Sequence, residues 1–477
     1  MKKLFAVLLS LFITLTAVFP AFAVSEDEWN EYWKTAEAQS GVTVFPGSDE
    51  TERNISWYSE KESTPRVELT DSTGTTKTFE GKAIRTYEGE YANKVTVTGL
   101  EKGKEYSYKC ISEGYTSETY TIETAADNSF SALYVTDVHI SYDTENEDSI
   151  RNQAYMFNSV IEQAETKSDI SIILSAGDQA SLGREDEYKG YTSPKIERSL
   201  SVATAPGNHD RKGVAYKYFK NMPNEQTFNL NGSYITGDYW FVKGDVLFMV
   251  MESNNGSAVD HHMFMKKAVA ANKDVKWRVV MMHHDLYSGR ITHRESENSL
   301  LRTIWAPLFS EMQVDLVLLG HSHYYTVSKV MNNNRIMADT GANAVVENAP
   351  GTVCMVSGSI NRPRNDKSED LGIRDTCGYY YAGQEDQVLY NVIDFSEDSI
   401  KVNSYSYTNN ELFNTLTLKK DSQKGGHPSS VPAAIYGPFL YVLGTIYQFF
   451  NNIGVYNNLK DSGYDVSLID TVFKFVK

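Results

Sequence analysis

Short apolar runs alternate with amphipathic segments through the middle of the chain. Five of the runs have the length and composition of buried strands: residues 130–136, 170–175, 202–204, 279–282 and 316–319. Apolar side chains recur at helical spacing in residues 150–166 and 299–312, and strand-like alternation marks residues 239–251, 388–395 and 400–407. This succession predicts an α/β layered domain over residues 129–420.

The pattern changes in front of this domain. Residues 42–123 contain short alternating segments separated by polar, turn-rich residues, which is typical of a small β-sandwich. We therefore predict an all-β domain over residues 42–126, with residues 124–128 as the connection to the next domain. Residues 24–41 predict a short acidic amphipathic helix.

Apolar segments also lie at both ends of the chain. Residues 1–23 begin with two lysines, continue without charge and end in Ala21-Phe22-Ala23, which predicts a signal peptide and a secreted or cell-surface protein. In the C-terminal region, residues 425–477, a helix over 438–452 would be about 22 Å long, shorter than the roughly 30 Å core of a bilayer. Residues 466–476 form a second amphipathic stretch. A helical pair on the preceding domain, self-association, and an interfacial membrane contact through residues 431–476 are all compatible with this pattern.

The composition argues against one class of binding partner, and it does not decide whether the cysteines form a disulfide bond. The net charge of −17 over 477 residues argues against nucleic acid as a steady partner. Cysteine occurs at Cys110, Cys354 and Cys377. An exported chain permits a disulfide between Cys354 and Cys377, and three unpaired thiols are an equal alternative.

Residues that could bind metals or take part in catalysis follow directly after the five apolar runs. The residues that follow them are Asp137-Val138-His139, Gly177-Asp178, Gly207-Asn208-His209-Asp210, His283-His284-Asp285 and Gly320-His321-Ser322-His323. One such stretch would be ordinary turn chemistry, but six of the ten histidines fall in these motifs. Because the carboxyl ends of neighbouring strands meet at one edge of a sheet, we expect the motifs to form one site.

The residue types indicate metal ions. In an extended backbone, residues i and i+2 point to the same face, so Asp137 with His139, and His321 with His323, could each offer two groups to one point. Mixed imidazole and carboxylate ligands favour Zn, Mn or Fe over Ca or Mg. The glycines at 177, 207 and 320 precede ligand candidates and let the backbone turn sharply near the site.

The number of candidate ligands suits a pair of ions. Seven side chains qualify: Asp137, His139, Asp178, Asn208, His283, His321 and His323. If one carboxylate bridges, each of two metals receives four protein ligands, with positions left for a hydroxide and a substrate oxygen. Two cations roughly 3.5–4 Å apart suit displacement at phosphorus, because they stabilise the attacking and leaving oxygens together.

The ordered series D-V-H, G-D, G-N-H-D, H-H-D-L-Y-S and G-H-S-H resembles the calcineurin-like metallophosphoesterase superfamily. The β-sandwich ahead of it and the H-x-x-x-Y-S pattern at His283 narrow the resemblance to relatives of the purple acid phosphatases. Residues 95–108 resemble part of a fibronectin type III-like domain, and Trp57 stands where such a fold buries an aromatic side chain. The resemblance implies a metallophosphoesterase fold, which is a layered β-sandwich flanked by helices. A small all-β sandwich domain would precede it in the sequence.

The same resemblance assigns roles to the motif residues. Asp178 would bridge the two metals. The first metal would also be held by Asp137, His139 and His323, and the second by Asn208, His283 and His321. His209 would contact the phosphoryl group and protonate the leaving oxygen, and Asp210 would orient His209.

One position departs from the purple members. They carry a metal-binding tyrosine three residues after the bridging aspartate, where this chain has Ser181, and the first motif supplies His139 instead. The departure favours a Zn, Mn or Fe(II) pair over an obligatory ferric ion.

The sequence identifies residues that could contact the substrate less clearly than it identifies the metal ligands. His284 and Arg290 are candidates, although His284 can instead support its neighbour His283, and Arg290 can lie in a solvated loop. His261 and His262 are expected on a loop after Asn254 and Asn255.

The sequence as a whole predicts an exported hydrolase in which a metal-bridging hydroxide attacks a phosphate ester. The alternative is a non-catalytic surface protein with a vestigial phosphoesterase domain.

Overall fold

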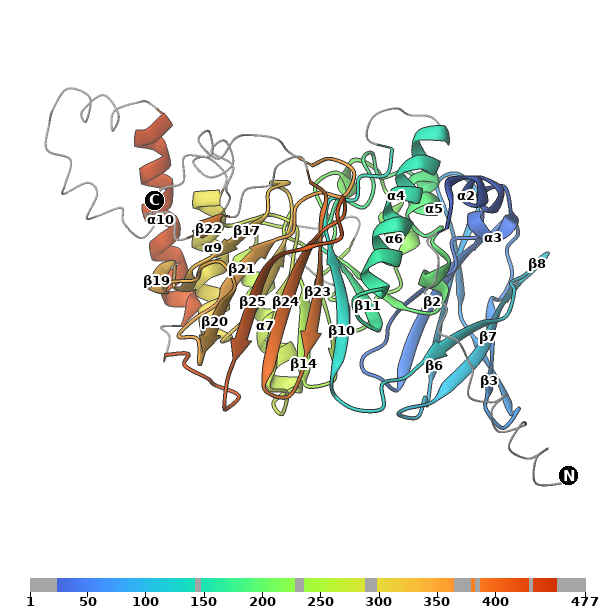
Figure 1. The fold of residues 1–477 in the computed structure, drawn as a ribbon, viewed down its shortest axis with the longest axis horizontal. Coiled ribbons are helices and arrows are strands. Elements are labelled where there is room, and N and C mark those ends of the chain that lie inside the picture. Colours follow the sequence, from blue (N-terminus) through green and yellow to red (C-terminus); the bar gives the residue numbers. More distant parts are fainter. Residues whose placement is uncertain are drawn as a thin grey trace, which may run out of the picture.

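Two β-sheets packed face to face form the centre of the structure (Figure 1). The structure, a computed structural model, describes residues 24–141, 147–227, 236–287, 298–363, 379–381, 387–428 and 432–452. The predicted signal peptide, Arg290, Cys377 and residues 466–476 lie outside this described part.

In the described part of the chain, the larger sheet has 11 strands. Its centre contains three parallel neighbours, β10, β11 and β12, which are the predicted apolar runs 130–136, 170–175 and 202–204. In spatial order the strands are β20 (Ala344–Glu347), β25 (Leu412–Lys419), β24 (Ser399–Ser406), β23 (Leu389–Phe395), β10 (Phe130–Val135), β11 (Ile170–Ser175), β12 (Ser201–Thr204), β1 (Thr43–Pro46), β2 (Glu52–Ser59), β6 (Tyr91–Thr98) and β5 (Lys82–Arg85).

The smaller sheet is buried on both faces. In β15, Val279 and Met281 pack into the core between the sheets, whereas Val280, and Met282 just after the strand, pack against the outer helices. A strand covered on both sides needs an unbroken apolar run, which explains the sequence pattern. The described strands are β13 (Tyr239–Lys243), β14 (Val246–Val250), β15 (Trp277–Met281), β16 (Leu316–Leu319), β21 (Val353–Val356), β17 (Thr326–Ser328) and β22 (Tyr379–Tyr381).

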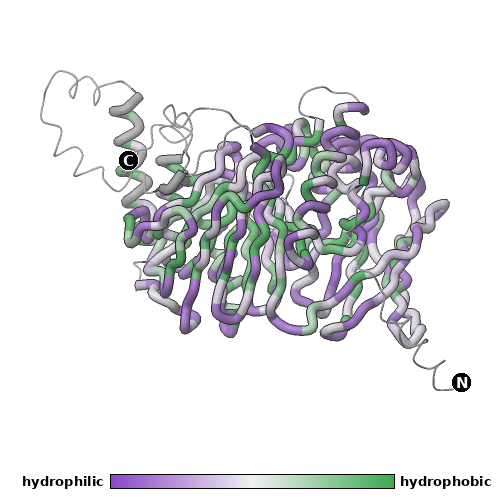
Figure 2. Tube along the Cα trace, viewed as in Figure 1, coloured by the Kyte–Doolittle hydropathy of each residue, from purple (hydrophilic) through white to green (hydrophobic). Residues whose placement is uncertain are grey.

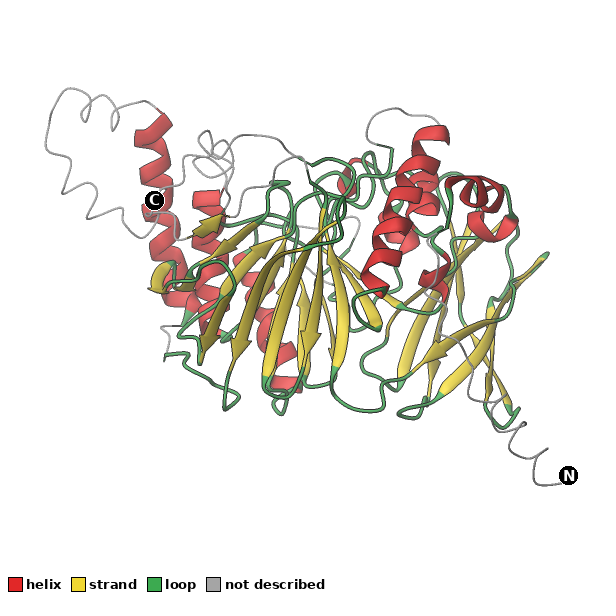
Figure 3. Ribbon diagram, viewed as in Figure 1, coloured by secondary structure: helices red, strands yellow, loops and turns green. Residues whose placement is uncertain are grey.

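Helices pack on the outer face of the smaller sheet and on the part of the larger sheet around β10 and β11 (Figure 3). The predicted helices 150–166 and 299–312 are α4 and α9, and Figure 2 shows hydrophobic residues concentrated along the central strands beneath them. The larger described helices are α2 (Glu26–Trp33), α4 (Glu147–Glu165), α5 (Glu185–Tyr191), α7 (Ala258–Ala271), α9 (Asn298–Glu311) and α10 (Ala433–Asn452), and the short ones are α3 (Ala36–Gln39), α6 (Tyr216–Phe219), η1 (Lys195–Arg198) and η2 (Asp210–Lys212). A separate hairpin joins β18 (Val330–Asn332) to β19 (Arg335–Ala338).

The N-terminal sandwich is continuous with the larger sheet. Its second sheet contains β4 (Thr76–Glu80), β3 (Arg66–Asp71), β7 (Glu105–Ser112), β8 (Tyr115–Thr116) and β9 (Tyr120–Glu123). Trp57 is buried between the two layers, as predicted. The sequence did not indicate that β1 would pair in parallel with β12, with Val44 opposite Ser201. The sandwich therefore shares a sheet with the α/β domain, and the α/β fold class with an all-β N-terminal region is confirmed.

The C-terminal helix α10 begins earlier than its sequence predicts. It starts at Ala433 instead of Pro438, because the Ala433 N–H donates to the Glu311 carboxylate at the end of α9, 2.6 Å away. A carboxylate at a helix N-terminus also complements the helix dipole. Among the described residues, none of the helices combines the length and apolar character that a bilayer crossing needs.

Candidate metal centre

The five motifs meet where strands of both sheets end. β10, β11 and β12 of the larger sheet lead into Asp137, Asp178 and Asn208, and β15 and β16 of the smaller sheet lead into His283 and His321. The structure brings all seven predicted ligands together, as the distances below show.

One group of side chains surrounds the Asp137 carboxylate. Asp137 Oδ1 lies 3.1 Å from His323 Nε2 and 3.7 Å from His139 Nε2. The two imidazole Nε2 atoms are themselves 3.1 Å apart. Three potential ligand atoms thus face one small, buried volume.

A second group surrounds the Asn208 amide oxygen. Asn208 Oδ1 lies 3.0 Å from His283 Nε2 and 3.0 Å from His321 Nδ1. The Asp178 carboxylate lies between the two groups, since its Oδ2 is 3.3 Å from His283 Nε2 and 3.6 Å from His139 Nε2. Asp178 is therefore the side chain that could serve both groups.

The backbone at these positions is not extended, so Asp137 and His139 meet in one group without strand alternation. His321 and His323, which were predicted to share one point, instead face different groups. β10 and β16 end at Val135 and Leu319, before their motifs begin. Five non-glycine ligand positions adopt left-handed backbone conformations: Asp137 (φ 51°), His139 (φ 52°), Asp178 (φ 53°), His321 (φ 74°) and His323 (φ 61°). Such conformations cost about 1–3 kcal/mol each, and they redirect His321 towards Asn208 while His323 faces Asp137.

Close backbone approach explains the glycines of two motifs. A Cβ on Gly207 would lie 2.0 Å from Asp178 Oδ1, and one on Gly177 would lie 2.3 Å from His283 Nδ1. Gly177 also has φ +100°, which disfavours any side chain. The two positions need glycine so that the ligand loops can touch.

The surroundings leave one oxygen of each carboxylate facing the histidines. Asp137 Oδ2 accepts hydrogen bonds from Thr136 Oγ1 (2.8 Å) and the His321 N–H (2.9 Å), whereas Oδ1 is buried and accepts none from the described residues. Asp178 Oδ1 accepts the His209 N–H at 2.8 Å, and its Oδ2 faces the imidazoles. This arrangement suits cations held between carboxylate and imidazole.

Backbone carbonyls fix the orientation of two imidazoles. His283 Nδ1 lies 3.0 Å from the Ala176 carbonyl oxygen, and His323 Nδ1 lies 3.0 Å from that of Arg362. A proton on each Nδ1 leaves Nε2 to bind a metal, which is the usual support of a histidine ligand.

The site is electrostatically coupled. Burial raises the pKa of Asp137, but His323 and His139 outweigh it and hold the pKa of that carboxyl well below its usual range. Burial lowers the pKa of His283, but the Asp178 carboxylate raises it to about 10. The negative charge of the carboxylates is therefore offset by the positive charge of a protonated imidazole. A bound cation would take the place of that imidazole proton.

His209 lies beside both groups. Its ring centre is 4.7 Å from that of His139, and its Nδ1 lies 2.9 Å from the Ser181 carbonyl oxygen and 2.6 Å from Lys212 Nζ. Burial lowers the pKa of His209 from its ordinary value. The ring is held at the rim of the site by Ser181 and Lys212.

Asp210 has partners other than the His209 ring. Its carboxylate accepts the N–H groups of Asp178 (2.8 Å), Gly207 (2.7 Å) and Ala180 (3.1 Å) and the hydroxyl of Tyr188 (2.6 Å). The predicted orienting role is thus taken by Ser181 and Lys212, and Asp210 instead ties the loops of Asp178 and Asn208 together.

Histidines outside the two groups have structural partners. His284 Nδ1 lies 2.8 Å from Ser253 Oγ, and the His284 ring lies tilted against that of His321 with the ring centres 4.6 Å apart, which fits the supporting alternative. His261 and His262 lie on α7 and not on a loop, because Ser257 caps that helix and accepts the Asp260 N–H. His261 is buried against Asp238 at 2.7 Å.

Supporting residues missed in the sequence follow β21. Ser359 Oγ donates to the Asp137 carbonyl oxygen (2.7 Å), and Asn361 Nδ2 donates to that of Val138 (2.7 Å). The sequence did contain a signal, because residues 353–356 are a further apolar run that is followed by Ser357, Ser359, Asn361 and Arg362. This sixth strand end holds the first motif in place.

The chain matches two known families. Residues 130–325 match the Calcineurin-like phosphoesterase family, and residues 39–124 match the Purple acid Phosphatase, N-terminal domain family. Purple acid phosphatase PPD1 from yellow lupin (Lupinus luteus) seeds shares the fold, with a TM-score of 0.62 and 15% identity over 82% of this chain and 76% of the lupin chain.

Two sequence relatives match a small part of the chain. Uncharacterized proteins of two Mycobacterium tuberculosis strains (CDC 1551 / Oshkosh and ATCC 25618 / H37Rv) are 30% identical over 103 residues. The match spans 20% of this chain and 19% of each relative, well under two thirds of their length.

Proposed function

Because the chain carries a calcineurin-like phosphoesterase domain behind a purple acid phosphatase N-terminal domain, we propose that it hydrolyses phosphate esters with two divalent transition metals. The observation that carries the proposal is the convergence of seven ligand-type side chains from both sheets, with Asp178 Oδ2 between the two imidazole groups. Asp137, His139 and His323 would hold one ion, Asn208, His283 and His321 the other, and Asp178 both.

The ligand chemistry fits Zn, Mn or Fe. Imidazole nitrogens make up most of the donor set, and such sites favour these metals over Ca or Mg. Ser181 cannot supply a phenolate ligand, and among the described residues its buried hydroxyl has no hydrogen-bond partner. We therefore expect a centre without charge-transfer colour.

When bound, the two cations supply a nucleophile at neutral pH and neutralise charge on the phosphoryl group. The chain contributes position and proton transfer. The partly buried His209 ring lies against His139, where it can donate a hydrogen bond to a phosphoryl oxygen and protonate the departing alkoxide. Asp210 keeps the backbone of Asp178 and Gly207 fixed during these steps.

The test is turnover of mono-aryl and bis-aryl phosphates by the purified chain, before and after chelation and after re-addition of Zn, Mn or Fe. We expect chelator-sensitive hydrolysis that one of these metals restores. Absence of turnover with every metal would favour the alternative, a surface protein with a vestigial phosphoesterase domain.

We also propose that hydrolysis takes place outside the cytoplasm. The support is the sequence of residues 1–23, two lysines followed by an uncharged apolar stretch that ends in Ala21-Phe22-Ala23. Mass spectrometry of the chain from its producing cells should find a new N-terminus at residue 24. Recovery of the chain in the cytoplasm with Met1 intact would refute export.

A further inference from the structure

Two exposed basic side chains lie at the rim of the candidate metal centre. Arg211 and Lys212 belong to the short helix η2, directly after the loop that carries His209. Lys212 Nζ lies 2.6 Å from His209 Nδ1 and 3.5 Å from His209 Nε2, and it donates to the Ser181 carbonyl oxygen at 3.2 Å. The ammonium group of Lys212 is therefore next to the ring that we propose as the proton donor to the leaving oxygen.

Arg211 is held by a different neighbouring segment. Its Nη1 donates to the Asn254 carbonyl oxygen at 3.3 Å. Asn254 in turn lies against the site, because its Nδ2 donates to the Gly207 carbonyl oxygen at 3.3 Å. Among the described residues this is the one acceptor of the Arg211 guanidinium, whose other N–H donors remain available to a ligand.

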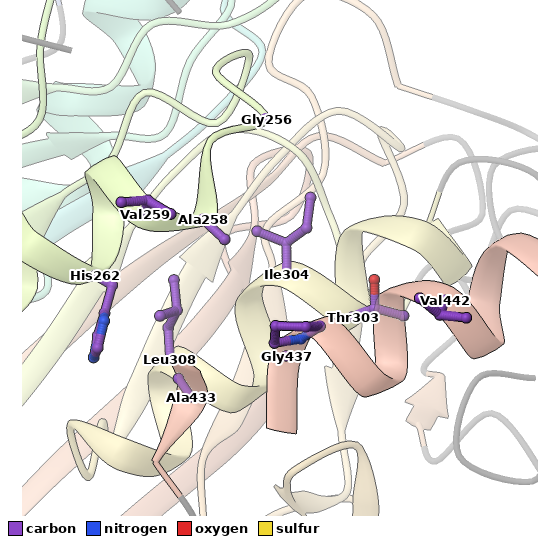
Figure 4. Close-up of a pocket in the computed structure, with 11 residues that line it drawn as sticks. Gly256, Ala258, Val259, His262, Thr303, Ile304, Leu308, Ala433, Gly437 and Val442 are labelled. Carbon is purple, nitrogen blue, oxygen red and sulfur yellow. The ribbon is translucent and has the colours of Figure 1, made fainter. Parts of the chain in front are cut away.

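The two cations differ from other basic groups in having no acidic partner. In the described part of the chain, neither Arg211 nor Lys212 forms an ion pair with an Asp or Glu side chain. His262, on the wall of an apolar cavity of about 560 Å³ between α7, α9 and α10 (Figure 4), is by contrast paired with Glu311 at 3.0 Å. In a chain with 45 Lys and Arg against 62 Asp and Glu, two adjacent cations without an acidic partner form a local positive patch that attracts anions.

The phosphoryl group alone does not need this patch. Two divalent ions, the carboxylates of Asp137 and Asp178, the attacking hydroxide and a protonated His209 would together carry about two positive charges. A phosphate monoester carries roughly two negative charges at neutral pH. The proposed centre therefore already matches the charge of the phosphoryl group, and Arg211 and Lys212 add positive charge beyond it.

We propose that Arg211 and Lys212 bind a second anionic group, a carboxylate or a phosphate, on the leaving group of the substrate. The inference rests on the proposed phosphoesterase function. If His209 protonates the leaving oxygen, the leaving group lies next to the ring that Lys212 contacts. The planar guanidinium of Arg211 matches the paired oxygens of a carboxylate or phosphate, and the flexible lysine supplies a second charge. The preferred substrates are phosphate esters whose alcohol or phenol is itself negatively charged.

The test compares kcat/KM for 4-carboxyphenyl phosphate, 1,4-phenylene bisphosphate and the uncharged 4-carbamoylphenyl phosphate. The carboxylate and the amide have nearly the same size, so these two esters differ mainly in charge. We expect the metal-loaded wild type to favour each anionic ester by about three- to tenfold, after correction for the two equivalent phosphates of the bisphosphate, because exposed ion pairs contribute modestly. The preference should shrink at high salt, because exposed charges are screened.

Substitutions remove the intrinsic reactivity of the esters from the comparison. Arg211→Met and Lys212→Met should each lower the ratio of kcat/KM for the anionic and uncharged esters, and the double variant should have no preference. Lys212→Arg retains a cation and should retain the preference. Lys217→Met is the matched control with an unchanged ratio, because Lys217 Nζ lies over the Tyr218 ring, 4.7 Å from its centre.

A ratio in the double variant equal to that of the wild type would overturn the inference and leave the proposed function standing. A second measurement needs no variant: 4-hydroxybenzoate should inhibit the wild type at least threefold more strongly than 4-hydroxybenzamide. Equal inhibition by the two phenols would also overturn the inference. Absence of hydrolysis of all three esters with every metal would overturn the proposed function, and the inference with it.

Discussion

His323 Nε2 lies 3.1 Å from Asp137 Oδ1, although the two residues follow strands of different sheets. The proposed centre therefore exists only where the sheets are docked. Tyr134 of β10 joins them directly beneath the site, since its hydroxyl accepts the N–H of Ser357 at 3.2 Å and lies 3.1 Å from the Met355 carbonyl oxygen. Catalysis and the packing of the two sheets should consequently be lost together on unfolding.

Replacing the shared carboxylate should abolish activity. In Asp178→Asn the atom that faces both His139 and His283 loses its charge. Loss of a residue that merely supports a metal ligand costs roughly 10–100-fold, so loss of the shared ligand should cost more. The measurement is kcat/KM for an aryl phosphate.

The control for this variant is Asp398→Asn, because the Asp398 side chain is 88% exposed and pairs only loosely with Lys276 at 3.4 Å. It should retain full turnover. Full turnover in Asp178→Asn, with a native circular dichroism spectrum, would contradict the assignment.

Removing the His209 ring should separate catalysis from metal binding. His209→Ala should lower kcat by about 10²–10⁴-fold, the usual contribution of a positioned acid or base. Its metal content should stay that of the wild type, because both metal groups are complete without it. His209 also lies within reach of His139 and Asp178, so a fall in metal content would show that the ring is a ligand.

A methyl group at Gly207 should disrupt the site. The added Cβ would lie 2.0 Å from Asp178 Oδ1 and 2.4 Å from the Asp178 nitrogen, which forces the two loops apart. We expect Gly207→Ala to lower the free energy of unfolding by about 1–3 kcal/mol and to impair turnover.

Gly256→Ala is the matched control for that substitution. Among the described residues, no atom lies within 4 Å of a Cβ added there, so stability should change by about 0.5 kcal/mol or less. Equal effects of the two substitutions would refute the steric explanation.

The Asp210 carboxylate should contribute more to the free energy of unfolding than any one of its hydrogen-bond partners does. Asp210→Asn replaces an acceptor of four hydrogen bonds with a group that places N–H towards N–H, and should cost about 1–3 kcal/mol. Tyr188→Phe removes one of the four and should cost about 0.5–1.5 kcal/mol. Urea denaturation gives both values, and the reverse ranking would contradict the proposed role of Asp210.

His261 should make stability depend on pH. Its Nδ1 faces Asp238 Oδ2 at 2.7 Å and its Nε2 faces the Asn255 carbonyl oxygen at 2.8 Å, so both nitrogens need a proton. Burial lowers the pKa of His261, but Asp238 outweighs it and raises the pKa above its ordinary value. A raised folded pKa adds stability that is fully present below the unfolded pKa, about 6.5, and is lost as pH rises through the folded value.

The destabilisation caused by His261→Gln should therefore be larger at pH 6, about 1.5–3 kcal/mol, than at pH 9. Thermal unfolding of both proteins across this range measures the difference. In an Asp238→Asn background the pH dependence should disappear. A constant difference between the wild type and His261→Gln at all pH values would show that the imidazole is neutral throughout.

The sequence predicted the strands of the site well, for a physical reason. Strands buried on both faces must be continuous apolar runs, and β10, β11, β12, β15 and β16 stand out for that reason. The ligand-type residues after each run were then sufficient to indicate one site, because the runs end at a common edge.

The backbone conformations and long-range contacts that bring these side chains together could not be predicted from the sequence. Left-handed conformations at residues such as His139 and His323 are imposed by the surrounding tertiary structure and leave no periodicity in the sequence. The pairing of β1 with β12 and the partners of Asp210 likewise depend on contacts between distant segments. Ser359 and Asn361 were missed because their side chains bind backbone carbonyls, which any sequence can supply.

The most direct test of the central claim is the metal content of the purified full chain, compared with that of His283→Ala and His323→Ala. The account predicts two transition metal ions per wild-type chain, and fewer in each variant because each loses a ligand from a different group. A wild-type chain that binds no transition metal when supplied with Zn, Mn and Fe, while retaining its folded spectrum, would contradict the account.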